Sequence, residues 1–188
     1  MKLRKRSFGL WLGAWLLLPV SVMASAVLPY ENKEAGVKLK YPADWIKAEN
    51  LPGTLVGFGV PKEKANLKMV ENVLLTVDNN LPAEAATLEK YTKMYEEQRQ
   101  KDAIAPRLLE SKKTKLGGLP AQSIVCAGKQ KGMDIKFWQI WTVKDGKAYL
   151  FTYGASKETY PKFLKEAERI VASFTLVKPS APKKVSGN

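Results

Sequence analysis

The stretch from Asp134 to Phe174 constrains the fold most, because two long apolar segments in it flank the dipeptide Asp145-Gly146. A type I′ hairpin turn needs positive φ at both central residues, and Asp-Gly is a favoured pair for it. With these two residues as the loop, the expected cross-strand pairs on one face are Val143/Ala148, Trp141/Leu150 and Gln139/Thr152. On the other face they are Thr142/Tyr149, Ile140/Phe151 and Trp138/Tyr153. Because both faces are largely apolar, we expect the hairpin to lie centrally in a sheet that is covered on both sides.

Two amphipathic helices are expected to provide these covers. The later helix follows the hairpin, with Ser156 as its expected N-cap and Pro161 in its first turn. Its apolar residues recur at helical spacing: Tyr160, Phe163, Leu164, Ala167, Ile170, Val171 and Phe174. The earlier helix is capped near Asn80 or by Thr87 and runs to about Lys101. Its expected apolar face consists of Ala85, Leu88, Tyr91, Met94 and Tyr95.

The rest of the chain reads mainly as strands. They are expected at residues 37–41, 54–60 and 72–77 before the first helix, and at 107–116 and 121–128 after it. The order βββ-α-ββ-ββ-α predicts an α+β fold with a central antiparallel β-sheet and α-helices on both faces. In the first strand Lys38 and Lys40 alternate with apolar residues, which predicts a half-buried strand that could stand at a sheet edge. Trp45 is expected to fold back onto the core.

The first 26 residues have the layout of a signal peptide. A basic segment precedes an apolar run at residues 8–22, and Ala24-Ser25-Ala26 offers the small residues that signal peptidase reads. We expect export to the periplasm or the extracellular cell envelope, with cleavage after Ala26; retention as a membrane anchor is the alternative. Residues 27–176 then form one domain, and residues 177–188, rich in Pro, Ser and Lys, form a disordered basic tail.

The composition argues against catalysis. The chain has no histidine, which removes Ser-His-Asp and Cys-His nucleophile systems and imidazole metal sites. Its single cysteine, Cys126, lies between Val125 and Ala127 and is expected to be a small buried hydrophobic residue. We therefore predict a protein that is not an enzyme, with no catalytic residues, no metal site and no cofactor.

The formal net charge of +13 bears on the choice of partner. The cations are mostly lysines scattered singly, not arginines interleaved with exposed aromatic residues, so nucleic acid is not expected as a partner. A solvated lysine-rich surface is the simplest explanation. An acidic protein or a membrane-associated complex fits the charge better than nucleic acid, and peripheral membrane association is allowed. Lys38 and Lys40 are the candidate partner contacts.

Three segments together resemble the PsbP-like superfamily: Val37-Lys-Leu-Lys-Tyr-Pro-Ala-Asp-Trp45, Gly118-Leu-Pro-Ala121, and Gln139 to Ala155 followed by a helix ending in Ala172-Ser173-Phe174. That group includes the extrinsic PsbP subunit of photosystem II, bacterial PsbP-related proteins and DcrB-like exported proteins. The resemblance covers residues 35–176 and implies a central antiparallel sheet with helices on both sides, export, and non-enzymatic binding to membrane complexes or proteins. The chain departs from some relatives in lacking a cysteine for lipid attachment, and it lacks the histidines of the metal sites proposed for plant members.

Two functional hypotheses follow. The first is an exported adaptor that docks onto an envelope or membrane protein complex through a lysine-bearing face. The alternative is a carrier of a small apolar or lipid ligand, held in a pocket between sheet and helix that is lined by Tyr91, Tyr95, Trp138 and Tyr153. A cavity of roughly several hundred Å³ beneath a helix would favour the carrier, and a tightly filled core would favour the adaptor.

Overall fold

The computed structural model describes residues 26–64, 71–101 and 106–178. In chain order the elements are β1 (Val27–Asn32), β2 (Val37–Pro42), β3 (Ile46–Ala48), β4 (Val56–Gly59), β5 (Asn72–Asp78), the 3₁₀ turn η1 (Ala83–Ala85), α1 (Leu88–Lys101), β6 (Arg107–Leu116), β7 (Leu119–Gln130), β8 (Met133–Lys144), β9 (Lys147–Ser156), α2 (Tyr160–Ala172) and β10 (Thr175–Leu176). The predicted signal peptide up to Ser25, and the predicted tail beyond Lys178, lie outside the described residues.

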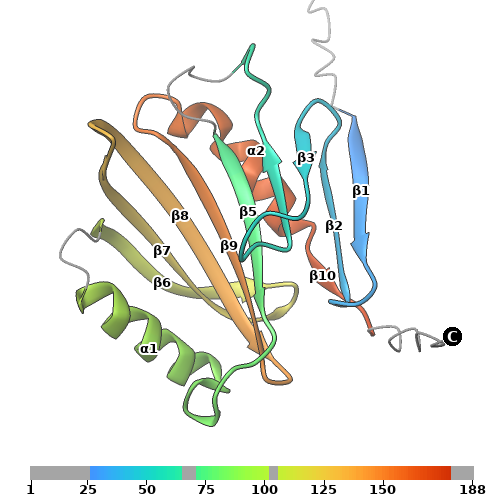
Figure 1. Ribbon diagram of the computed structural model, residues 1–188, viewed down its shortest axis with the longest axis vertical. Helices are drawn as coiled ribbons and strands as arrows, with labels where there is room; N and C mark the ends of the chain where they lie inside the picture. The colour runs from blue at the N-terminus through green and yellow to red at the C-terminus, as the bar shows by residue number, and fades with distance from the viewer. Residues whose placement is uncertain (1–25, 65–70, 102–105, 179–188) are drawn as a thin grey trace, which may run out of the picture.

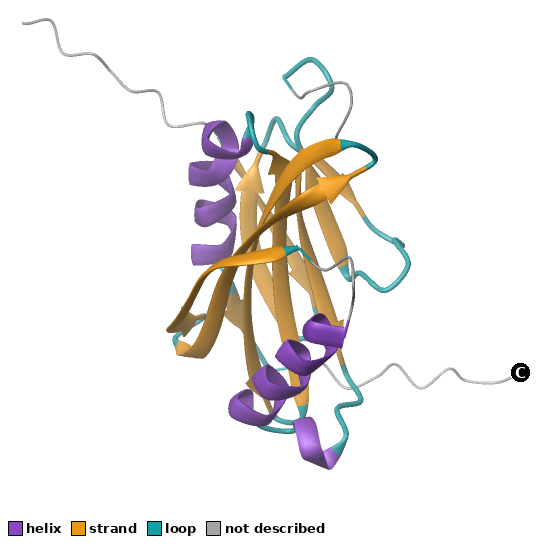
Figure 2. Ribbon diagram, turned by 90° about the vertical axis from the view of Figure 1, so that its left-hand side faces the viewer, coloured by secondary structure: helices purple, strands orange, loops and turns teal. Residues whose placement is uncertain are grey.

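The strands form two antiparallel sheets (Figure 1). The larger sheet has the order β3-β4-β5-β9-β8-β7-β6, and the smaller one has the order β1-β2-β10. The two helices lie on different sides of the larger sheet (Figure 2), and the smaller sheet shares the side of α2. The predicted α+β fold with helices on both faces is therefore confirmed, and a second sheet is added to it.

The hairpin β8–β9 has the predicted turn and register. Asp145 and Gly146 have φ values of 51° and 72°, as a type I′ turn requires. All six expected cross-strand pairs are formed, including Trp141 with Leu150 and Trp138 with Tyr153. β9 pairs further with β5, and β8 pairs with β7, so the hairpin lies in the middle of the larger sheet.

The α1 side of the larger sheet has a small aromatic core. Trp141 is fully buried, its Nε1 donates to Thr92 Oγ1 at 2.9 Å, and its ring centroid lies 4.8 Å from that of Tyr95. Cys126 is buried in the same cluster, as expected, and burial raises the pKa of its thiol. α1 is thereby anchored through its aromatic residues to the strands beneath it.

The α2 side contains the larger core. Phe58, Phe151 and Phe174 are almost completely buried there, together with residues of α2 and of the smaller sheet. The Tyr41 ring of β2 lies 4.7 Å from the Phe58 ring, which joins the smaller sheet to the larger one. Trp45 is buried with its ring edge-to-face to Phe163, 6.4 Å between centroids, which confirms that it folds back onto the core.

Three short strands were not expected from the sequence, and one strand is placed differently. β2 lies between β1 and β10 in the smaller sheet, so an edge position for it is wrong. β1 contains Pro29 and lacks an apolar–polar alternation, while β3 has three residues and β10 two. Segments this short give too few residues for a period to appear, and they are recruited by pairing with longer neighbours.

The helix starts differ in one respect from expectation. Thr87 Oγ1 accepts the amide of Lys90 at 3.3 Å, so of the two proposed caps for α1 it is Thr87 that acts. α2 begins at Tyr160, and its N-cap position is Thr159. Ser156 Oγ accepts the Thr159 amide at 3.2 Å, so Ser156 caps the turn before the helix and not the helix itself.

Thr159 also contacts the buried carboxylate of Glu71. The Thr159 hydroxyl donates to Glu71 Oε1 at 2.5 Å, and Glu71 Oε2 has no partner in the part of the chain that the structure describes. Replacing Thr159 with valine should therefore lower the free energy of unfolding by about 1–3 kcal/mol, because a buried carboxylate then loses its hydrogen bond. Urea denaturation measures this. A loss matched by Thr175→Val, a change on an exposed strand position, would show that the contact with Glu71 is not stabilising.

Candidate functional site

Lys38 and Lys40 extend from β2 on the outer face of the smaller sheet, and both are exposed, as expected. Lys38 Nζ lies 3.3 Å from Glu31 Oε2, on the residue directly opposite in β1. An exposed pair of this kind contributes little to stability, but it offsets the charge that a partner would meet. Lys40 has no ion pair within the described residues.

The four aromatic residues expected to line one pocket are separated by the larger sheet. Tyr91 and Tyr95 belong to α1 and pack on its side, whereas Trp138 and Tyr153 belong to the α2 side. Tyr153 is fully buried, with its hydroxyl donating to the Tyr160 carbonyl at 2.9 Å, and burial is the main cause that raises its pKa. The structure therefore does not bring these four residues into one pocket, and a separate hollow lies on each side of the sheet.

The larger hollow lies between α2 and strands β6, β7 and β8. It consists of two adjoining cavities of about 690 Å³ and 240 Å³ that share Leu109, Lys136, Tyr160 and Leu164, and we call it the α2 groove. Trp138 lines the smaller cavity, with its Nε1 donating to Ser123 Oγ at 2.9 Å. Apolar and aromatic groups thus make up much of the wall between helix and sheet.

Cations predominate around the larger cavity. Arg107, Lys129, Lys136 and Lys157 line it, and Asp134 is its one acidic lining residue among those described. Asp134 Oδ1 lies 3.9 Å from Lys129 Nζ, so the aspartate offsets the charge of this lysine. Lys136 Nζ lies 4.5 Å from the centroid of the Tyr160 ring, a cation–π geometry. Arg107 and Lys157 are exposed at the rim, and neither forms an ion pair with another described residue.

Strand β6 forms one wall of this groove and is the last strand of the larger sheet. Among the described residues only β7 pairs with it, and nine of its ten residues are exposed or half-buried. A bulge between Leu108 and Glu110 places Leu109, 43% exposed, at the groove. An unpaired strand edge presents backbone N–H and C=O groups that an added extended segment can bind.

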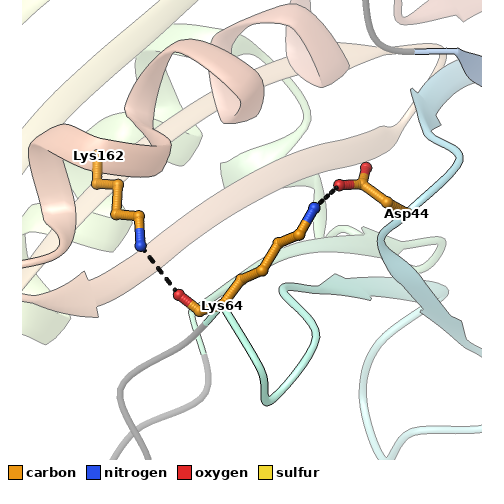
Figure 3. A network of polar contacts seen from close by, with 3 residues as sticks. All are labelled: Asp44, Lys64 and Lys162. Carbon is orange, nitrogen blue, oxygen red and sulfur yellow. Dashed lines mark hydrogen bonds and ion pairs between the residues drawn. The ribbon is translucent and has the colours of Figure 1, made fainter.

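Polar contacts tie the first turn of α2 to loops beyond the groove. Lys162 Nζ donates to the Lys64 carbonyl at 3.2 Å, and Lys64 Nζ donates to Asp44 Oδ2 at 2.6 Å (Figure 3). The hydrogen bond from Lys64 is the main cause that holds the pKa of Asp44 below its usual value. These contacts link α2, the loop after β4 and the turn after β2, and so help to position the helix.

The second hollow lies beside the C-terminal half of α1 and has a volume of about 560 Å³. We call it the α1 pocket; Tyr95, Gln98, Arg99, Pro106, Cys126, Phe137, Gln139 and Thr152 line it. Tyr95 is the one residue of the expected aromatic set found here. Its hydroxyl donates to Gln139 Oε1 at 3.0 Å, and Gln139 Nε2 donates to Thr152 Oγ1 at 3.1 Å.

Apart from Trp138 in the α2 groove and Tyr95 in the α1 pocket, sequence reasoning missed the residues that line the two hollows. The cations of the α2 groove come from three strands and one turn, and each stands alone in the sequence. The neighbouring leucines Leu108 and Leu109, in an otherwise polar strand, are the one local signal that could have indicated the groove. No cluster of acidic or cysteine residues that could hold a metal ion occurs among the described residues. None of the described helices is long and apolar enough to span a membrane.

The chain was compared with known protein families and with curated proteins, and only the first comparison found a match. The family described as PsbP-like protein matches residues 20–176, which is most of the chain. Among curated proteins nothing matches.

Solved structures with a similar fold come from several bacteria. The cyanobacterial PsbP of Synechocystis sp. PCC 6803 is 16% identical, with a TM-score of 0.56 over 83% of this chain and 95% of that one. LpqN of Mycobacterium tuberculosis, described as involved in cell envelope biogenesis, is 14% identical, with a TM-score of 0.57 over 81% and 91% of the two chains. A Pseudomonas aeruginosa protein of unknown function is also 14% identical, with a TM-score of 0.55 over 78% and 94%. At these identities the likeness concerns the fold.

Proposed function

We propose, starting from the fact that this chain belongs to the PsbP-like protein family, that it is an exported, non-enzymatic adaptor that docks onto an acidic segment of an envelope protein or membrane complex. Its similarity to LpqN, a protein involved in cell envelope biogenesis, supports an envelope location. The layout of the first 26 residues supports export.

The observation that carries the proposal is the cationic rim of the α2 groove beside an unpaired strand. Arg107 and Lys157 are exposed there without ion-pair partners among the described residues, which favours an acidic partner. On β6, Lys112 also lines the groove, where its Nζ is paired with Glu110 Oε1 at 2.7 Å, whereas Lys113 and Lys115 alternate onto the other face of the strand. An extended acidic segment that pairs with β6 would bring carboxylates to the cations of the groove, while an apolar side chain of the segment enters beside Leu109.

Lysines on an edge strand also discourage pairing with another copy of the same chain, since like charges would then face each other. This repulsion between copies is compatible with the proposed docking, because the same positive charge of β6 repels a second copy and attracts an acidic segment. Lys38 and Lys40 remain candidate contacts on a second surface; they do not line the groove, and Glu31 offsets Lys38.

Affinity capture from the envelope fraction of the source organism tests the proposal. The immobilised protein is expected to retain an acidic protein at low salt and to release it at high salt, because screening shortens to about 3 Å at 1 M ionic strength. The captured protein is then purified, and its binding is measured directly. Retention of nucleic acid alone, or of nothing at low salt, would count against the adaptor.

Export has a separate test at the N-terminus. If signal peptidase acts after Ala26, N-terminal sequencing of the protein from the envelope fraction should begin at Val27. Replacing Ala24 with a large residue such as tryptophan is expected to block this cleavage and leave the longer form. Recovery of the wild-type protein with Met1 intact would contradict processing.

The alternative, a carrier of a small apolar or lipid ligand, is favoured by one specific observation, the α1 pocket. Its volume of about 560 Å³ lies in the range of small-molecule sites. This pocket is on the side of the sheet opposite the α2 groove, so docking and carrying need not exclude each other.

A further inference from the structure

We propose that the α1 pocket is a binding site for a small, singly charged carboxylate with an apolar body, held by Arg99. This site is independent of the docking surface described above, because the larger sheet separates the two. The ligand is identified by three features of the lining residues: charge, unmet hydrogen bonding and shape.

Charge comes first. Arg99 is the one charged residue among the described residues that line the pocket. Its guanidinium carries five N–H donors and no acceptor, so it suits an anionic ligand. One cation balances one negative charge, which favours a monocarboxylate over a phosphate monoester with up to two charges.

The hydrogen bonds of Arg99 are incomplete. Its Nη1 donates to the Pro106 carbonyl at a long 3.5 Å, and its Nε is buried without a partner within the described residues. A buried donor with no acceptor costs free energy, and structures normally satisfy it. Because Nε is closed off from the pocket, a carboxylate would bind at the outer Nη atoms, of which Nη1 has only the long bond to Pro106. Carboxylates commonly bind guanidinium groups through two parallel hydrogen bonds.

The neighbouring polar groups are already paired with one another. Tyr95, Gln139 and Thr152 form a continuous chain of hydrogen bonds across the wall of the pocket. None of them donates to or accepts from Arg99, which leaves the guanidinium as the group that still needs a partner. The Arg99 charge reaches this wall, since it partly offsets the rise that burial causes in the pKa values of Tyr95 and Cys126.

Apolar surface accounts for the body of the ligand. The rings of Tyr95, Phe137 and Pro106 line the pocket together with the Cys126 side chain. Phe137 is only half-buried, so part of its ring faces the hollow and gains from contact with an apolar group. A volume of about 560 Å³ accommodates a short acyl or aryl chain.

Ligand titration followed by NMR tests the site. The probes are straight-chain carboxylates from acetate to octanoate and 3-phenylpropionate, each paired with its primary amide, with phenyl phosphate as a dianionic control. The longer carboxylates are expected to shift the Arg99 Nε–H and Gln139 side-chain signals and to bind roughly 10- to 100-fold more tightly than their amides, the effect of a charge-assisted hydrogen bond.

Matched variants make the result decisive. Arg99→Gln should abolish the preference for carboxylate over amide, whereas Arg169→Gln, which removes an exposed charge on α2, should leave the preference intact. Charge reversal in the α2 groove should likewise leave it unchanged, which separates this site from the docking function. The inference is overturned if no carboxylate in the panel binds, or if Arg99→Gln retains the preference. It is also overturned if Arg99→Gln lowers thermal stability while binding is unaffected, since Arg99 is then a structural tie to Pro106.

Discussion

Replacing Trp141 with alanine is expected to lower the free energy of unfolding by about 3–5 kcal/mol, the range for truncating a large buried aromatic residue. Trp141 is fully buried at the centre of the α1-side core, where its ring packs on Tyr95. Its Nε1 also donates to Thr92, so the substitution removes the link between β8 and α1 as well as the ring. Urea denaturation of the wild-type and variant proteins measures the loss.

Trp138→Ala provides the matched control on the same strand. Trp138 points to the other side of the sheet, is only half-buried and lines the α2 groove. Its removal should cost clearly less stability than the removal of Trp141, because less of its surface is taken out of water. If the loss for Trp141→Ala were below about 1 kcal/mol, the residue would not be part of a packed core.

Reversing two charges at the rim of the α2 groove should weaken docking strongly while leaving the fold intact. The variant combines Arg107→Glu with Lys157→Glu, both exposed positions without ion pairs among the described residues. The association rate with the captured acidic partner is expected to fall roughly 10- to 1000-fold at low salt, since electrostatic steering then opposes the encounter. Lys136 is left unchanged because it packs over the Tyr160 ring.

The pair Lys38→Glu with Lys40→Glu changes the net charge by the same amount on the other surface. Because Lys38 faces Glu31 across the strand pair, this variant should lose a little stability, within about 1 kcal/mol. The Lys38/Lys40 reversal should slow association less than the Arg107/Lys157 reversal does. Equal effects would mean that total charge, and not the groove, governs binding.

The central hairpin could be predicted in full because local rules determine it. Asp145-Gly146 specifies the turn, the turn sets the register, and a period of two then assigns every side chain to a face. The long helices follow from apolar spacing in the same way, so the cover on each side of the sheet was also predictable. Family membership could be inferred as well, since the resemblance includes the hairpin and the end of the last helix.

The second sheet and the candidate site depend on contacts that no local pattern encodes. β1 and β10 become strands only because β2 lies between them in the smaller sheet. In the sequence they are far apart, since every strand of the larger sheet comes between them. The aromatic residues Trp138 and Tyr95 looked like partners because both are large and amphipathic. The alternation of β8 sends Trp138 to the side of α2, and Tyr95 belongs to the helix on the opposite side.

The measurement that tests the adaptor most directly is the affinity of the purified protein for its captured partner across a series of salt concentrations, for the wild-type protein and the Arg107/Lys157 reversal. Wild-type affinity is expected to fall steeply as salt rises, and the reversal variant is expected to bind weakly at every salt concentration, with little dependence on salt. Affinity that does not change with salt or with the reversal would contradict docking through the α2 groove, and a stoichiometric apolar molecule found in the same preparation by mass spectrometry would identify the protein as a carrier instead.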